Sequence, residues 1–227
     1  MVVFGNAWLG IWVGAVALGI VGGLAAVATA AEPEVKGTSL KGKRVAVLVT
    51  DGFEQPEMVE PRKALDAAGA KTVLVSPKPG HVKAWNSTDW GDQFPVDQSL
   101  DDAKPDEFDA LLLPGGVMNP DKLRLNPKAV QFVKAFAEAE KPIAAICHGP
   151  WTLIEADAVR GHTLTSWPSL QTDIRNAGGT WVDGEVVSDH GLVTSRKPSD
   201  IPAFNRAMIE SFGGSKNRPA APPTTKR

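Results

Sequence analysis

Four short apolar runs divide the middle of the chain, and longer polar or amphipathic segments separate them. None of the runs shows the strict alternation of a half-exposed strand, which favours strands that are buried on both faces of a sheet. The runs are RVAVLVT (44–50), KTVLVS (71–76), ALLLP (110–114) and PIAAI (142–146). They predict neighbouring strands of one buried sheet.

Helical patterns lie between these runs. After the first run, Pro56 suits the first turn of a helix and Gly69 suits its end. Residues 126–140 place apolar side chains on one stripe at helical spacing. The segment from Pro77 to Gln98 is rich in turn-forming residues and tryptophan, and it predicts a loop or an irregular hairpin.

The later part of the chain continues the alternation. Residues 169–179 predict a helix that ends at glycines, and residues 185–195 predict two short strands around a turn. Asp200 suits the cap of a last helix from Pro202 to Phe212. Alternating strands and helices favour an α/β sandwich with a mainly parallel sheet.

The two ends differ in composition from the folded part, which we place at residues 41–213. Residues 7–31 carry no charge, and Ala28-Thr29-Ala30 near their end is a pattern typical of signal peptides. The stretch is also long enough to span a bilayer. We therefore expect residues 1–31 to be a signal peptide or a membrane anchor, with the folded part exported to a periplasmic or extracellular space. A membrane anchor would have the opposite orientation, with the folded part on the cytoplasmic side, only if the basic residues at 41–44 kept that side in the cytoplasm. Residues 215–227 are Pro-rich and polar, and they predict a disordered tail.

Composition narrows the classes of function. The 227 residues carry a net charge of −2 and no dense basic run, so nothing indicates nucleic-acid binding. A single cysteine excludes an internal disulfide. One cysteine and four scattered histidines show no usual ligand spacing, so no metal site is predicted.

The single cysteine, Cys147, directly follows the fourth predicted strand and precedes His148 and Gly149. A strand that turns abruptly into a helix exposes the side chain at the turn, as in a nucleophile elbow, and Gly149 leaves room for that turn. Free cysteine is also among the most buried residue types, so a structural cysteine is the alternative. The position at a strand end favours the nucleophile.

Other polar features also follow predicted strands. Asp51–Glu57 follows the first strand, Ser76 ends the second, and Gly115 and Gly116 follow the third. Sites in open parallel sheets form beyond the carboxyl ends of the strands, so we expect these segments to converge on Cys147. Amides from the glycine pair and from the residue after the thiol then suit an oxyanion hole.

Two carboxylates are candidates for the same site. Glu57, at the start of the first helix, is placed to reach the thiol, and burial would keep its carboxyl protonated. An acidic first helical turn also needs no chemistry, because the helix dipole stabilises it. Asp121 follows the glycine pair, and its sequence context alone indicates a solvated loop charge.

Taken together, these segments resemble the PfpI family of the class I glutamine-amidotransferase-like superfamily over about residues 41–213. The resemblance implies a flavodoxin-like three-layer sandwich. The motifs that carry it are LLLPGG, AICHGP, GFEQPE, KAWNSTDWGDQFPVD and VTSRKPSDIPAF.

The resemblance also implies roles for individual residues. Cys147 matches the nucleophile, His148 its general base, and Glu57 the carboxyl that hydrogen-bonds the thiol. Asp121 matches an acidic residue that enters from an adjacent subunit and orients the histidine, which implies a homo-oligomer with a composite site. Gly116 and the His148 amide match the oxyanion hole.

Members of the family are described as proteases, as deglycases of methylglyoxal adducts, or as cofactor-free glyoxalases. The resemblance therefore implies a cysteine hydrolase without a cofactor that acts on small carbonyl, glycated or peptide substrates. Trp85, Trp90 and Trp151 either wall its pocket or serve as core aromatics. The rival hypotheses are a redox-responsive stress protein, in which Cys147 is oxidised reversibly, and a binding module with an inert thiol.

Overall fold

The structure is a computed structural model that describes residues 37–214. The predicted signal or anchor segment and the predicted tail lie outside the described residues, so both stay predictions. Within residues 37–214, no helix is long and apolar enough to cross a bilayer.

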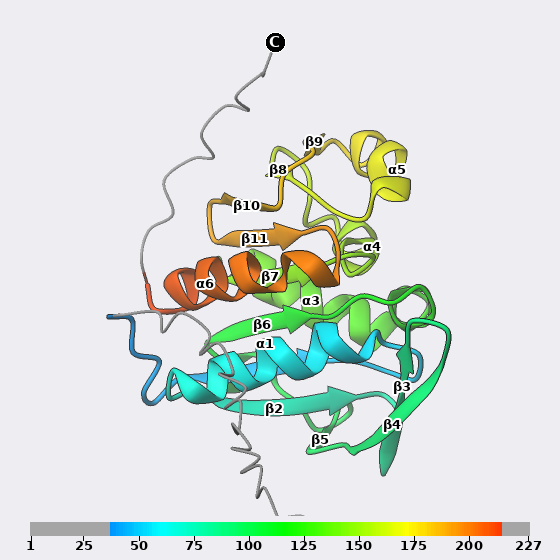
Figure 1. The fold of residues 1–227 in the computed structure, drawn as a ribbon, viewed down its shortest axis with the longest axis vertical. Coiled ribbons are helices and arrows are strands. Elements are labelled where there is room, and N and C mark those ends of the chain that lie inside the picture. The colour runs from blue at the N-terminus through cyan, green and yellow to red at the C-terminus, as the bar shows by residue number, and fades with distance from the viewer. Residues whose placement is uncertain (1–36, 215–227) are drawn as a thin grey trace, which may run out of the picture. The chain divides into compact units, whose positions relative to one another are not determined.

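A seven-stranded sheet forms the centre of the described chain, in the order β10-β11-β7-β6-β1-β2-β5 (Figure 1). Neighbouring strands are parallel except β10 and β11, which are antiparallel. The strands are β1 (Arg44–Leu48), β2 (Lys71–Ser76), β5 (Gln98–Ser99), β6 (Ala110–Leu113), β7 (Ile143–Ile146), β10 (Val186–Asp189) and β11 (Leu192–Ser195).

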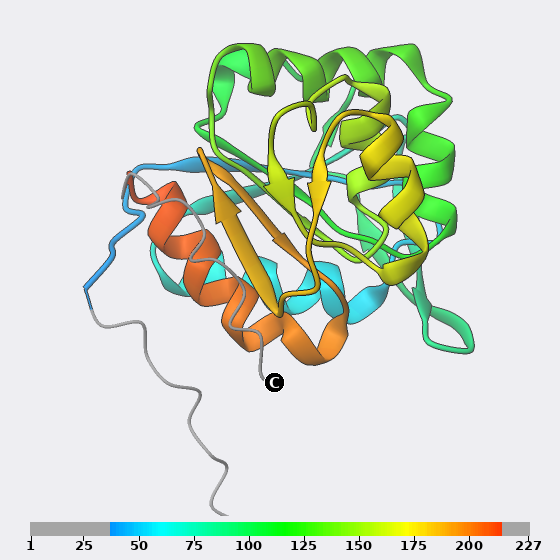
Figure 2. The same ribbon diagram turned by 90° about the horizontal axis from the view of Figure 1, so that it is seen from above.

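Helices cover both faces of this sheet (Figure 2). Helices α1 (Gln55–Ala67) and α6 (Ile201–Phe212) pack together on one face. The other face carries α2 (Met118–Arg124), α3 (Pro127–Glu138) and α4 (Pro150–Glu155). Smaller elements are α5 (Gln171–Asn176) and the 3-10 turns Pro105–Glu107, Pro168–Leu170 and Pro198–Asp200.

Two hydrophobic cores explain why the strands read as continuous apolar runs. Leu111 and Leu112 are adjacent on β6 and both fully buried, yet Leu111 packs with Phe136 on one face and Leu112 with Phe204 on the other. Successive side chains of a strand point to opposite faces, so a strand between two helical layers needs apolar residues at every position. The predicted α/β sandwich with a mainly parallel sheet is therefore confirmed.

The elements outside the central sheet agree only in part with the sequence expectations. The segment from Pro77 to Gln98 contains the hairpin of β3 (His81–Asn86) and β4 (Asp89–Pro95), and its register shifts between Lys83 and Trp85, so the irregular hairpin expected from the sequence is confirmed. Helix α2 and the two-residue strands β8 (Thr163–Leu164) and β9 (Thr180–Trp181) were not predicted, because each is too short to show a period. Asp200 precedes α6, but its carboxylate binds Arg196 instead of capping the helix.

Asn126 is the clearest helix cap among the described residues. Its side-chain oxygen accepts hydrogen bonds from the amides of Lys128 (3.0 Å) and Ala129 (3.2 Å) at the start of α3. We expect Asn126→Ala to lower the free energy of unfolding by about 1 kcal/mol, measured by urea denaturation. Lys128→Ala, which keeps the cap, should change it by less than about 0.5 kcal/mol. Equal losses in both variants would contradict the capping role.

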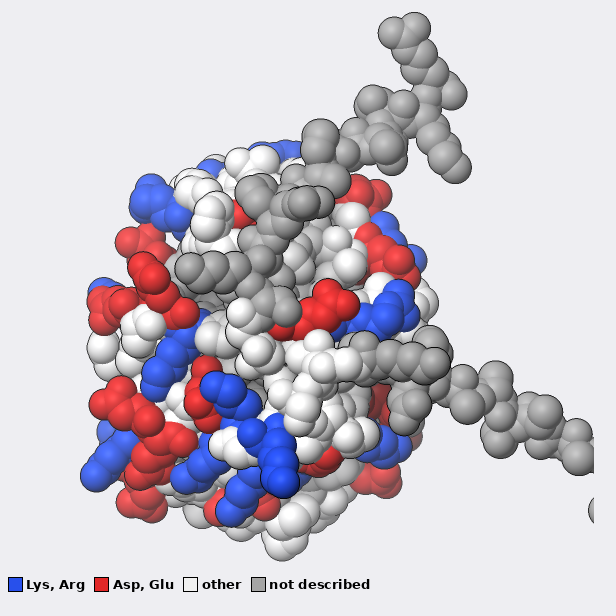
Figure 3. All heavy atoms as spheres, turned by 90° about the vertical axis from the view of Figure 1, so that its left-hand side faces the viewer, with Lys and Arg blue, Asp and Glu red and all other residues white. Residues whose placement is uncertain are grey.

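Charges of both signs are interspersed on the face of the molecule drawn in Figure 3, where Lys and Arg side chains alternate with Asp and Glu side chains. This mixture accords with the net charge of −2.

Candidate active site

The backbone turns sharply at Cys147, directly after β7. Its φ of +62° lies in the left-handed region, which is uncommon for a residue with a side chain and stores strain. The turn is fixed on both sides, since the Cys147 amide donates to the Ser195 carbonyl (3.0 Å) and the Cys147 carbonyl accepts from the Trp167 amide (2.9 Å). The abrupt strand-to-helix turn expected from the sequence is therefore present, and the side chain is 7% exposed.

Three glycines make room for this turn. A Cβ at Gly115 would lie 2.5 Å from Glu57 Oε2 and 2.7 Å from the Cβ of Cys147. A Cβ at Gly149 would lie 2.5 Å from the Leu113 carbonyl oxygen. Gly116 has a φ of +77°. The ends of β6 and β7 and the start of α1 approach so closely here that no larger residue fits.

Glu57 lies in the first turn of α1 and is completely buried. Its Oε2 accepts a hydrogen bond from the Gly115 amide (3.0 Å), while Oε1 has no well-aligned partner within the described residues. Burial, reinforced by the charge of Glu54, raises the Glu57 pKa to about 8, against hydrogen bonds from the Cys147 thiol and nearby amides that lower it. The carboxyl is therefore protonated at pH 7 and able to donate a hydrogen bond to the sulfur.

The thiol of Cys147 experiences opposing influences. Burial raises its pKa, and so does a negative charge on Glu57, whereas the amides of Gly116 and His148 lower it. Protonation of Glu57 at pH 7 removes the repulsion and turns the carboxyl into a donor. The thiolate is thus most stable while Glu57 holds its proton.

His148 is the base nearest to the thiol, with Nδ1 3.2 Å from Sγ. Burial lowers its pKa to about 4, so the imidazole is neutral at pH 7 and able to accept the thiol proton. The ring lies against Trp151 (centroids 5.1 Å apart) and stacks on Trp167 (5.9 Å). Its Nε2 lies 3.5 Å from the Ser169 hydroxyl, a long contact.

Not every predicted residue reaches this site. Ser76 lies on β2, which β1 separates from β6, and its hydroxyl accepts from the Lys78 amide (3.1 Å), so the expectation that it converges on the thiol was wrong. Asp121 is exposed on α2, and its carboxylate makes no hydrogen bond or ion pair with the described residues of this chain. Its assigned role comes from a second subunit and stays a prediction.

The tryptophans divide between two places. Trp151 contacts His148, which agrees with the interpretation that it walls the pocket. Trp85 and Trp90 instead form an edge-to-face pair on the β3–β4 hairpin (centroids 5.6 Å apart). Trp167, which stacks on His148, was missed because it lies twenty positions beyond the thiol in a segment without a motif.

Comparisons with known proteins agree with this geometry. Residues 43–211 match the DJ-1/PfpI family. General stress protein 18 of Bacillus subtilis is 47% identical over 170 residues, which cover 74% of this chain and 96% of that protein. Protein/nucleic acid deglycase 2 of Escherichia coli is 42% identical over 172 residues, which cover 75% and 98%.

The solved structures show the same fold. The crystal structure of Drosophila melanogaster DJ-1beta superposes with a TM-score of 0.69 at 29% identity, covering 76% of this chain and 91% of that one. The match in sequence and fold spans nearly all of the described residues, and we conclude that this chain belongs to the DJ-1/PfpI family.

Proposed function

We propose that the protein is a cofactor-free cysteine hydrolase that acts on glycated protein or on small carbonyl compounds such as methylglyoxal. The observation that carries the proposal is the environment of Cys147: a thiol on a strained turn, with the protonated Glu57 carboxyl and the Gly116 and His148 amides directed at it. A relative that is 42% identical is named a protein/nucleic acid deglycase, which supports the glycated substrate.

The residues suggest a simple division of labour. His148 accepts the thiol proton through Nδ1 in either case. At a hemiaminal carbon the sulfur displaces the amine, which leaves with that proton, and at a carbonyl carbon the sulfur adds to the C=O bond. The negative charge then moves to the substrate oxygen, which the Gly116 and His148 amides are placed to bind. Glu57 remains neutral and donates to the sulfur, so it assists the thiolate without repelling it. Peptide hydrolysis follows the same first step at an amide carbonyl.

We also propose that the site is completed in a homo-oligomer. The His148 imidazole has a pKa lowered to about 4, and its Nε2 has only the distant Ser169 hydroxyl for a partner within the described residues. A carboxylate beside Nε2 would raise this pKa and make the imidazole a stronger base. Asp121 of a neighbouring copy is the candidate, and cross-linking through an Asp121→Cys variant in a Cys147→Ser background would test its position.

Site-specific alkylation tests the proposed function without changing the sequence. Cys147 is the only cysteine, so iodoacetamide modifies a single thiol of the full-length chain. We expect the unmodified protein to consume methylglyoxal or release it from glycated peptides, and the alkylated protein to do neither. Turnover that survives complete alkylation, verified by mass, would refute the proposal. Activity on unmodified peptides alone would replace the carbonyl substrate by a peptide.

A redox role is the second candidate, and the 47% identical relative named general stress protein 18 favours it. It requires that mild peroxide oxidise Cys147 and that a thiol reductant restore it. Peroxide treatment followed by intact-mass measurement tests this directly. An unchanged mass would exclude the redox role while leaving the hydrolase proposal intact.

Glu57 predicts a specific pH dependence of catalysis. Because its pKa is about 8, the carboxyl ionises above that pH and places a negative charge beside the thiolate. We expect kcat/KM of the unmodified protein to fall as pH rises above about 8, and this fall to be absent in Glu57→Gln. Glu54→Gln, a matched change in the same turn, should keep it. An identical alkaline limb in Glu57→Gln would contradict the assignment.

The same carboxyl affects stability with a definite sign. Its folded pKa lies above the value of 4.5 for a free glutamate, so the folded state holds one more proton between about pH 4.5 and 8. The contribution of Glu57 to stability is thus largest below pH 4.5 and is lost as pH rises towards 8, by at most about 1.4 kcal/mol per pH unit. Urea denaturation at several pH values should show this slope diminished in Glu57→Gln.

A further inference from the structure

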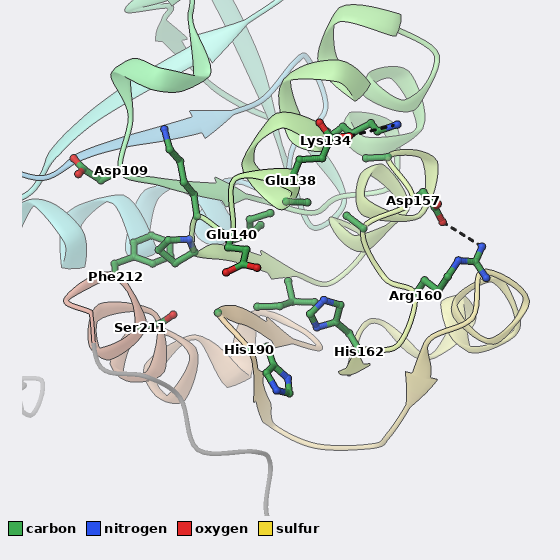
Figure 4. Close-up of a pocket in the computed structure, with 18 of the residues that line it drawn as sticks. Asp109, Lys134, Glu138, Glu140, Asp157, Arg160, His162, His190, Ser211 and Phe212 are labelled. Atoms are coloured by element: carbon green, nitrogen blue, oxygen red, sulfur yellow. Dashed lines mark hydrogen bonds and ion pairs between the residues drawn. The ribbon is translucent and has the colours of Figure 1, made fainter.

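A groove of about 1030 Å³ lies at the end of the sheet opposite Cys147 (Figure 4). It is lined by residues that precede strands, including Asp109 before β6, Pro142 before β7 and Gly191 before β11. Cys147 follows the other end of β7, five residues beyond Pro142, which is about 16 Å along an extended strand. The groove is therefore separate from the thiol site, and the proposed hydrolase chemistry does not use it.

Two histidines that line this groove meet one aspartate beside it. His162 precedes β8, Asp189 ends β10, and His190 occupies the turn between β10 and β11. One ligand atom from each residue lies within 4.8 Å of the others. Figure 4 shows both imidazoles on the same side of the groove. Residues 27 and 28 positions apart in the sequence are thus brought together by the fold, which explains why spacing did not reveal them.

The contacts within the trio centre on the Asp189 carboxylate. His190 Nδ1 lies 2.5 Å from Oδ1, and His162 Nδ1 lies 3.4 Å from Oδ2. The Thr163 amide donates to Oδ2 (2.8 Å), which fixes the carboxylate. His162 Nδ1 is buried yet has no hydrogen-bond partner of good geometry among the described residues. A buried ring nitrogen without a partner is a lone pair or an N–H that the protein alone does not satisfy.

The backbone at His190 is also unusual. It has a φ of +47° and is followed by Gly191 with a φ of +85°, the combination of a tight hairpin turn in which Asn, Asp or Gly is preferred at the first position. His190 therefore adopts a strained backbone conformation, although an asparagine at this position would form the same turn. Such strain is a reason to look for a role of the side chain.

We propose that His162, Asp189 and His190 form a binding site for a divalent transition-metal ion of the Zn²⁺, Ni²⁺ or Cu²⁺ type. Two imidazoles and one carboxylate are the donors that these ions prefer, whereas Mg²⁺ and Ca²⁺ prefer oxygen ligands alone. Asp189 is 6% exposed and held by a backbone amide, so one ligand is already positioned. His190 is mostly exposed, which gives the ion a path from solvent and leaves coordination positions for water.

Metal binding at this site would join the β10–β11 turn to the segment before β8. The turn belongs to the edge of the central sheet, whereas β8 pairs with β9 in a separate two-stranded sheet that contacts β10. An ion that binds only the folded arrangement stabilises it by mass action. We therefore expect a rise in Tm of roughly 5–10 °C when free Zn²⁺ is about 100-fold above its Kd.

Calorimetric titration of Zn²⁺ into the full-length, EDTA-treated and tag-free protein tests the proposal. The variants are His162→Gln and His190→Asn, and the second keeps the turn because asparagine tolerates a positive φ. The controls are His81→Ala, which removes a histidine outside the trio, and Cys147→Ser, which removes the thiol as an alternative ligand. Circular dichroism verifies that each variant is folded.

We expect one Zn²⁺ per chain in the unmodified protein and in both controls, and at least about 100-fold weaker binding in each trio variant, since even changes beyond the ligands weaken binding 10–100-fold. With Co²⁺, the complex should lack thiolate charge-transfer absorption. The proposal would be overturned if Zn²⁺ showed no saturable binding. It would also be overturned if binding survived either trio substitution in a folded variant, or if binding were lost in Cys147→Ser. Because the thiol does not take part in the proposed metal site, the result of the Zn²⁺ titration is independent of the proposed hydrolase activity.

Discussion

Cys147→Ser is expected to lower kcat/KM for the carbonyl substrate by about 10³-fold or more, while the free energy of unfolding changes little. A serine hydroxyl is a far weaker acid than a thiol, so neither the Gly116 and His148 amides nor the neutral His148 could generate a comparable nucleophile. Serine is nearly isosteric and keeps the backbone bonds to Ser195 and Trp167 that hold the turn. The measurements are steady-state turnover and urea denaturation of the same preparations.

His81→Ala is the matched control, because His81 is exposed at the start of β3 and takes no part in the proposed site. It should retain the activity of the unmodified protein. If Cys147→Ser retained it as well, thiol chemistry would be excluded and the protein would be better described as a binding module. A loss of stability in Cys147→Ser comparable to the loss of a core residue would instead favour the structural cysteine.

The sequence predicts best where a physical constraint acts on consecutive residues. Leu111 and Leu112 face different cores, and this requirement makes β6 an unbroken apolar run that is visible without a structure. The turn after β7 can be predicted for a similar reason, because the apolar run of the strand is followed directly by Cys147, His148 and Gly149. Glu57 could be named as a candidate, but its full burial and raised pKa depend on how α1 meets the end of β6.

Features assembled from distant segments could not be predicted. Trp167 stacks on His148, and its amide donates a hydrogen bond to the Cys147 carbonyl; both contacts join loops that have no regular sequence pattern. The position of β2 beyond β1, which removes Ser76 from the site, is a matter of strand order and not of strand identity. His162 and His190 meet because β8 lies beside β10, and two-residue strands leave no periodic signal.

Gly116→Ala is expected to damage both stability and catalysis. The φ of +77° disfavours alanine by about 1–2 kcal/mol. The added Cβ would also lie 2.6 Å from the Gly52 carbonyl oxygen and 2.7 Å from the Glu54 amide nitrogen, and overpacking against backbone adds about 1–3 kcal/mol. Any shift that relieves these contacts moves the Gly116 amide away from the sulfur, so kcat/KM should fall about 10²–10³-fold.

Gly80→Ala separates the two causes. Gly80 has nearly the same φ, +78°, but a Cβ there would meet nothing within 4 Å. It should therefore lower the free energy of unfolding by only the backbone contribution of about 1–2 kcal/mol and leave kcat/KM unchanged. Equal stability losses in the two variants would show that the close approach at Gly116 can relax. If Gly116→Ala also kept full activity, the amide of residue 116 would not bind the developing oxyanion, and the hole would have to be sought elsewhere around Cys147.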